Sequence, residues 1–137
     1  MNIEQIEHIG IAVKSIEETL FFYEEILGLK CYKIEDVPEQ KVKTAFLKIG
    51  QVKLELLEAT DDESPIAKFI AKRGEGIHHI ALKSGNLVSD LNELKSKNIR
   101  LIDENPRDGA DEMKIAFVHP KSTHGILLEI CQPKTNK

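Results

Sequence analysis

The same pattern of residues occurs twice along the chain, and this repeat limits the fold more than any other feature of the sequence. IEHIGIAV near the N-terminus is matched by IHHIALKS, and each run is followed by an amphipathic segment and by further strand-like runs. His8 and His79 are 71 residues apart, and Glu55 and Glu129 are 74 residues apart, so the two spacings agree within a small loop insertion. Self-similarity of this kind indicates tandem structural units. We therefore predict two modules of one design.

The alternation of apolar and polar residues predicts a β-α-β-β-β order in each module. In the first module the predicted elements are a strand at 6–13, a helix that Ser15 begins and Gly28 ends, and strands at 30–34, 42–49 and 51–58. In the second they are a strand at 77–84, a helix at 86–98, and strands at 99–104, 114–120 and 125–133. A short helix at 65–74 links the modules, and the helix of the first module places apolar side chains at Leu20, Phe21, Ile26 and Leu27.

These elements predict one α+β domain over residues 1–137. Its first module covers about 4–60, the linker helix about 61–74, and the second module about 75–133. Neither module can cover its own sheet alone, so we expect the two sheets to lie side by side in a curved half-barrel, with the helices outside. The polar segment 103–112 is the expected mobile rim.

Composition excludes several classes of protein. The net charge is −4 and the basic residues are scattered, which argues against nucleic acid as a partner. No apolar run approaches the roughly 20 residues that span a bilayer, so no membrane partner is expected. The N-terminus lacks the pattern of a secretory signal, which favours a cytoplasmic location. Cys31 and Cys131 have no CxxC spacing and are expected to be free thiols.

The histidines and glutamates of the repeat are the candidates for a metal site. Side chains alternate across a strand, so His8 lies on the face opposite Ile9 and Ile11, and His79 lies opposite Ile80. By the same alternation Glu55 and Glu129 point away from the apolar faces of their strands. The expected set is therefore His8, Glu55, His79 and Glu129.

Two nitrogen and two oxygen ligands suit a divalent ion such as Co²⁺, Zn²⁺, Ni²⁺ or Mn²⁺, and the sequence does not choose among them. Such an ion stabilises charge on a carbonyl oxygen when the adjacent carbon loses its proton. Glu129 or Glu55 is the candidate catalytic carboxylate that takes and returns this proton. Lys121, Ser122 and Thr123 are candidate contacts for a phosphate or carboxylate of the substrate, although an ordinary polar hairpin explains them equally well. His78 is expected to face the helices.

The chain resembles the vicinal-oxygen-chelate superfamily, which includes glyoxalases, bleomycin-resistance proteins and dioxygenases, and within it the methylmalonyl-CoA epimerase family. HIGIAV is shared across the superfamily, whereas DDESPIAKFIAKRGEGIHHIAL with HPKST is characteristic of the epimerases. The resemblance implies metal ligands at His8, Glu55, His79 and Glu129, with glutamine at the position of Glu55 in some relatives. It implies epimerisation at C2 of methylmalonyl-CoA, between the R and S forms, through a metal-stabilised enolate. It also implies an acyl-CoA substrate and a homodimer.

One position departs from the family pattern. A glutamate proposed as the catalytic base in some relatives aligns approximately with Thr44, which has no carboxylate. Two alternatives to the epimerase stay open. One is lactoylglutathione lyase, or glyoxalase I, which isomerises the hemithioacetal of methylglyoxal and glutathione with the same metal set. The other is a non-catalytic protein of the same fold that only binds a small molecule.

Overall fold

In a computed structural model, which describes residues 1–135, the chain has two compact units. One unit is His8–His78, and the other joins Met1–Glu7 to the chain from His79 onward. Strands β1 (Ile3–Ala12) and β5 (Gly76–Ser84) each begin in one unit and end in the other. The predicted module boundaries follow the repeat rather than these units, so they stay a prediction.

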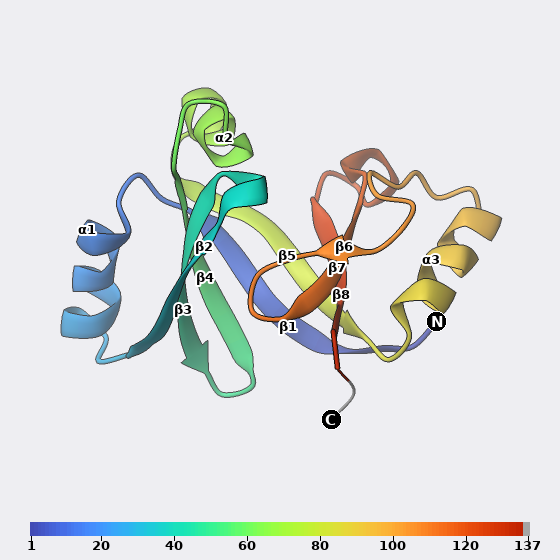
Figure 1. The fold of residues 1–137 in the computed structure, drawn as a ribbon, viewed down its shortest axis with the longest axis horizontal. Helices are drawn as coiled ribbons and strands as arrows, with labels where there is room; N and C mark the ends of the chain where they lie inside the picture. The colour runs from blue at the N-terminus through green and yellow to red at the C-terminus, as the bar shows by residue number, and fades with distance from the viewer. Residues whose placement is uncertain (136–137) are drawn as a thin grey trace. The chain divides into compact units, whose positions relative to one another are not determined.

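In the unit His8–His78, four strands are hydrogen-bonded in the order β2-β3-β4-β1. The additional strands are β2 (Cys31–Val37), β3 (Val42–Ile49) and β4 (Val52–Ala59), all antiparallel to their neighbours except for the parallel pair β1 and β4. Helix α1 (Ile16–Leu20) covers one face of these strands, and its Ile16 packs with Leu47 and Leu56 (Figure 1). A short η2 turn (Pro38–Gln40) and helix α2 (Pro65–Arg73) complete the unit.

The other unit repeats this arrangement with the strand order β5-β8-β7-β6. Its further elements are α3 (Leu87–Ser96), β6 (Arg107–Asp108), β7 (Met113–Val118), η3 (Pro120–Ser122) and β8 (Leu128–Pro133). Strands β5 and β8 are parallel and the other pairs antiparallel. Helix α3 lies beside β8, where Leu87 and Leu91 pack with Val118 and Ile130 (Figure 1). The α+β class and the tandem modules are confirmed.

The strand predicted at 99–104 is wrong. This segment contains a single bridge, between Leu101 and Val118, and the edge strand of the unit is β6 instead. The backbone N–H groups of Ile102 and Asp103 both donate to the carbonyl of Phe117, at 2.8 and 3.2 Å, and the Asp103 carboxylate accepts from the Phe117 N–H at 2.9 Å. The side chain thus replaces a regular ladder of backbone bonds. Residues 107–108, predicted as part of a loop, form the strand.

The helix predicted from Ser15 to Gly28 has a change of register. Ser15 caps α1 by accepting a hydrogen bond from the Glu18 N–H at 3.1 Å, as expected, but from Phe21 to Ile26 the chain is π-helical (η1). The wider turn rotates the following side chains relative to an α-helix. Leu20 therefore packs on the core, whereas the other predicted apolar positions are exposed, namely Phe21, Ile26 and Leu27.

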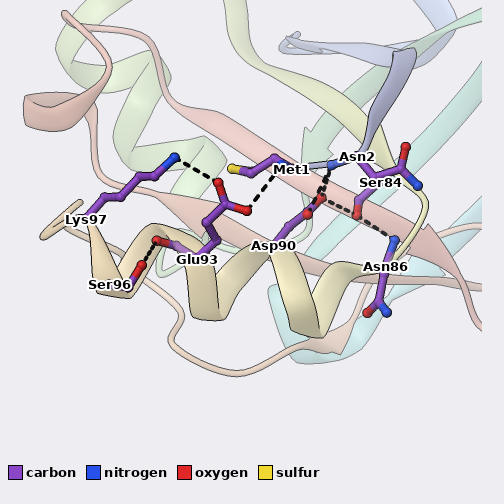
Figure 2. A network of polar contacts seen from close by, with 8 residues as sticks. All are labelled: Met1, Asn2, Ser84, Asn86, Asp90, Glu93, Ser96 and Lys97. Atoms are coloured by element: carbon purple, nitrogen blue, oxygen red, sulfur yellow. Dashed lines mark hydrogen bonds and ion pairs between the residues drawn. The ribbon is translucent and has the colours of Figure 1, made fainter.

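The first residues of the chain bind to α3 through polar contacts, which Figure 2 shows. The carboxylate of Asp90, on the buried side of α3, accepts from the Asn2 N–H at 3.2 Å and from the Ser84 hydroxyl at 2.6 Å. The Ser84 oxygen in turn accepts from the Asn86 N–H, and the Gly85 N–H donates to the Asn2 carbonyl. These bonds explain why residues 1–7 belong with the unit that contains α3.

Within residues 1–135, none of the helices combines the length and the apolar character needed to cross a bilayer.

Candidate metal centre

The first predicted pair of ligands lies in the unit His8–His78. His8 comes from β1 and Glu55 from β4, and the parallel register sets Gly10 directly opposite Glu55. The Nδ1 atom of His8 lies 3.0 Å from an Oε atom of Glu55, and the two residues are only 4% and 5% exposed. Because Gly10 has no side chain, the carboxylate can extend across the neighbouring strand toward the imidazole. The structure therefore joins these two predicted residues.

The second pair repeats this geometry in the other unit. Here Ala81, two residues after His79 on β5, lies opposite Glu129 on β8, as Gly10 lies opposite Glu55. The Nε2 atom of His79 lies 3.4 Å from an Oε atom of Glu129, and both residues are buried. The sequence repeat thus corresponds to a repeated arrangement in three dimensions.

Each pair also has a phenylalanine and a cation beside it, which the sequence analysis missed. Phe46 lies directly opposite Glu55, and Phe117 lies directly opposite Glu129. The Phe117 ring meets His79 edge-on, with 5.5 Å between centroids. Lys33 lies over the Phe46 ring and Arg107 over the Phe117 ring, both at 5.5 Å.

The offsets of the repeat could have identified these four residues. Phe46 and Phe117 are 71 residues apart, like the two histidines, and Lys33 and Arg107 are 74 apart, like the two glutamates. A search for identical or similar residues at these two offsets finds them. The repeated unit of the site is therefore a histidine, a glutamate, a phenylalanine and a cation.

The pairs fit a divalent metal ion. Neighbouring ligand atoms around an ion with bonds of about 2.1 Å lie about 3.0 Å apart in an octahedron and about 3.4 Å apart in a tetrahedron. The observed separations of 3.0 and 3.4 Å have these values. Burying a carboxylate is costly unless a cation compensates its charge. Buried imidazole and carboxylate groups at this spacing suit borderline ions such as Co²⁺, Ni²⁺ and Zn²⁺.

The other predicted residues lie apart from these pairs. Lys121 is exposed on η3, the Ser122 hydroxyl accepts from the Arg100 N–H at 2.9 Å, and the Thr123 hydroxyl donates to the Ile126 carbonyl. Their role as substrate contacts stays a prediction. Thr44 is buried on β3, directly opposite Glu35.

His78 faces the helices, as expected. Its ring meets Phe69 of α2 edge-on, with 5.1 Å between centroids. Burial lowers the pKa of His78 from 6.5 to about 4, and the positive charge of Arg73 lowers it further in the same direction. The imidazole is therefore neutral at physiological pH and serves as a packing group.

Comparison with known proteins identifies the family. The model of the Glyoxalase/Bleomycin resistance protein/Dioxygenase superfamily matches residues 7–117. The chain belongs to this superfamily. Within the superfamily, it is 36% identical over 132 residues to the mitochondrial methylmalonyl-CoA epimerase of Homo sapiens, a match that covers 96% of this chain and 75% of the human protein. This degree of similarity places it in the epimerase family, whose members are isomerases.

Two further relatives agree with this assignment. The uncharacterized protein YqjC of Bacillus subtilis is 47% identical over 130 residues, covering 95% of this chain and 93% of YqjC. A solved methylmalonyl-CoA epimerase, in complex with methylmalonyl-CoA and NH4+, superposes with a TM-score of 0.92 at 36% identity, covering 96% of both chains. The superfamily fold predicted from the repeat is confirmed.

Proposed function

We propose that this chain epimerises methylmalonyl-CoA at C2 and interconverts its R and S forms. The observation that carries the proposal is the pair of buried histidine–glutamate contacts, repeated in both units at the spacing of metal ligands. The names of the full-length relatives support the reaction and the acyl-CoA substrate. The metal dependence and the substrate belong to the proposal.

One divalent ion would be held by His8, Glu55, His79 and Glu129. When bound, this ion supplies a Lewis acid that stabilises the negative charge of the enolate oxygen. The chain's own residues orient the acyl group and move the proton. Glu129 is the proposed carboxylate for proton transfer on one face of C2, with Glu55 as the other candidate, and a well-placed general base contributes about 10² to 10⁴ in rate.

The anionic groups of the substrate would contact the segment Lys121–Thr123. The exposed ammonium of Lys121 is the group best suited to a phosphate of coenzyme A, because the hydroxyls of Ser122 and Thr123 bond to the backbone of the chain itself. These two hydroxyls would instead hold the segment in shape.

The test is to remove metal with a chelator, restore Co²⁺, and follow a single epimer of methylmalonyl-CoA in D₂O. We expect rapid inversion at C2 with incorporation of deuterium, and no reaction in the metal-free protein. The hemithioacetal of methylglyoxal and glutathione is assayed alongside. Fast isomerisation of that compound without epimerisation would assign the site to a lactoylglutathione lyase, and silence in both assays would leave a binding protein.

A further inference from the structure

The face of the sheet that carries His8 and Glu55 also carries a second carboxylate. Residues directly opposite one another in an antiparallel pair share a face. Glu35 on β2 lies opposite Thr44 on β3, and Thr44 lies opposite Leu57 on β4, two residues from Glu55. Among the acidic residues of β2, β3 and β4, alternation therefore places Glu35 and Glu55 on this face, and Asp36 and Glu58 on the other.

The surroundings of Glu35 place it at the edge of the same surface as the His8–Glu55 pair. Its side chain is 31% exposed and lies 3.2 Å from the ammonium of Lys33. Lys33 lies over the ring of Phe46, which is fully buried and directly opposite Glu55. An acyl group resting on Phe46 would have the His8–Glu55 pair on one side and Glu35 on the other.

Thr44 lies between Glu35 and the strand of Glu55. Strands are about 4.8 Å apart, so two strand spacings, about 10 Å, separate the backbones of β2 and β4. The short side chain of Thr44 leaves the space above this row open to a substrate or a water molecule. A carboxylate can act on a substrate proton through one water. Glu35 is therefore within reach of a group bound above Phe46 and Thr44.

The repeat makes Glu35 unusual among the residues of this face. At the offset of 74 that relates Lys33 to Arg107, the residue equivalent to Glu35 is Gly109. The groups suited to holding a metal occur in both units, whereas this carboxylate occurs in one. An epimerase needs such asymmetry, because it removes a proton from one face of a carbon and returns one to the opposite face.

We propose that Glu35 is the second acid–base residue of the reaction, a role that rests on the proposed function above. In one direction the C2–H bond breaks, its proton passes to the Glu35 carboxylate directly or through one water, and the electron pair remains in the enolate. A proton from a group outside this unit, for which Glu129 is the candidate, then bonds to C2 on the opposite face. In the reverse direction the two groups exchange roles, and solvent restores their protonation states between turnovers.

The test compares Glu35→Gln with the wild-type protein, using each pure epimer of methylmalonyl-CoA in D₂O with Co²⁺ restored. Glu35→Gln should slow inversion by about 10² to 10⁴. It should still exchange the C2 hydrogen of one epimer for deuterium, because the group on the opposite face is intact. Glu35→Asp should recover part of the inversion rate. Asp36→Asn, on the same strand but the opposite face, is the matched control and should behave as wild type.

Two results would overturn the role of Glu35 alone. One is a Glu35→Gln variant that inverts C2 within about threefold of the wild-type rate. The other is equal loss of inversion and of exchange from both epimers, which is the signature of general damage to the site. A wild-type protein that binds Co²⁺ and inverts neither epimer would instead overturn the proposed function, and the role of Glu35 with it.

Discussion

Glu55 and Glu129 occupy equivalent places in the two histidine–glutamate pairs, yet they need not be equally important for the rate. Both are buried, and each lies opposite a phenylalanine. A glutamine retains an oxygen that can bind a metal but loses the negative charge and the ability to accept a proton. The two substitutions therefore separate holding the ion from moving the proton.

Glu55→Gln should keep kcat within about tenfold of wild type, whereas Glu129→Gln should lower it by about 10² to 10⁴, the usual contribution of a general base. The comparison requires steady-state rates with saturating Co²⁺ for both variants. Equal effects would show that neither carboxylate has a special role in proton transfer. A larger effect at Glu55 would transfer that role to the other pair.

His78 gives the chain a defined dependence of stability on pH. Its pKa is about 4 when folded and near 6.5 when unfolded, so between these values the unfolded chain binds the extra proton. Stability therefore falls as the pH drops through this window. Urea unfolding of the metal-free protein should show a smaller loss between pH 7 and pH 5 for His78→Gln than for wild type. His124→Gln, at an exposed position, is the control, and identical slopes in all three proteins would contradict this account.

At the scale of elements, the attachment of residues 1–7 to α3 depends on the buried Asp90 carboxylate. Asp90→Ala leaves the Asn2 N–H and the Ser84 hydroxyl without this acceptor. Loss of a buried, charged hydrogen-bond partner should lower the free energy of unfolding by about 2 to 4 kcal/mol. Asn92→Ala, exposed on the same helix, should change it by less than about 1 kcal/mol. Chemical denaturation measures both, and a neutral Asp90→Ala would show that the network contributes little.

The elements also show where local patterns were sufficient. Ser15, Ser64 and Asn86 each cap a helix with a side-chain acceptor, and cap residues of this kind can be recognised in a sequence. The π-helical turn after Leu20 could not be predicted in this way, because a change of one residue per turn leaves the composition unchanged. The missing strand at 99–104 depends on the Asp103 carboxylate bonding to Phe117, a contact between segments that local alternation does not report.

At the scale of the whole chain, the repeat predicted more than the individual patterns. Alternation along four strands placed His8, Glu55, His79 and Glu129 on the correct faces, and the equal offsets suggested that they act together. Alternation could not show that residues 1–7 belong with the unit that begins at His79, because this depends on contacts with α3. It also missed the phenylalanine opposite each glutamate, since strand register, rather than composition, brings these residues together.

The central claim is that the two pairs hold a single ion, and titration of the metal-free protein with Co²⁺ by calorimetry tests it most directly. We predict one ion per chain, with the affinity lowered by about 100-fold or more in both His8→Ala and His79→Ala. His124→Ala should bind as wild type, and circular dichroism confirms that each variant is folded. Two ions per chain, or wild-type affinity in either of the first two variants, would contradict a shared site.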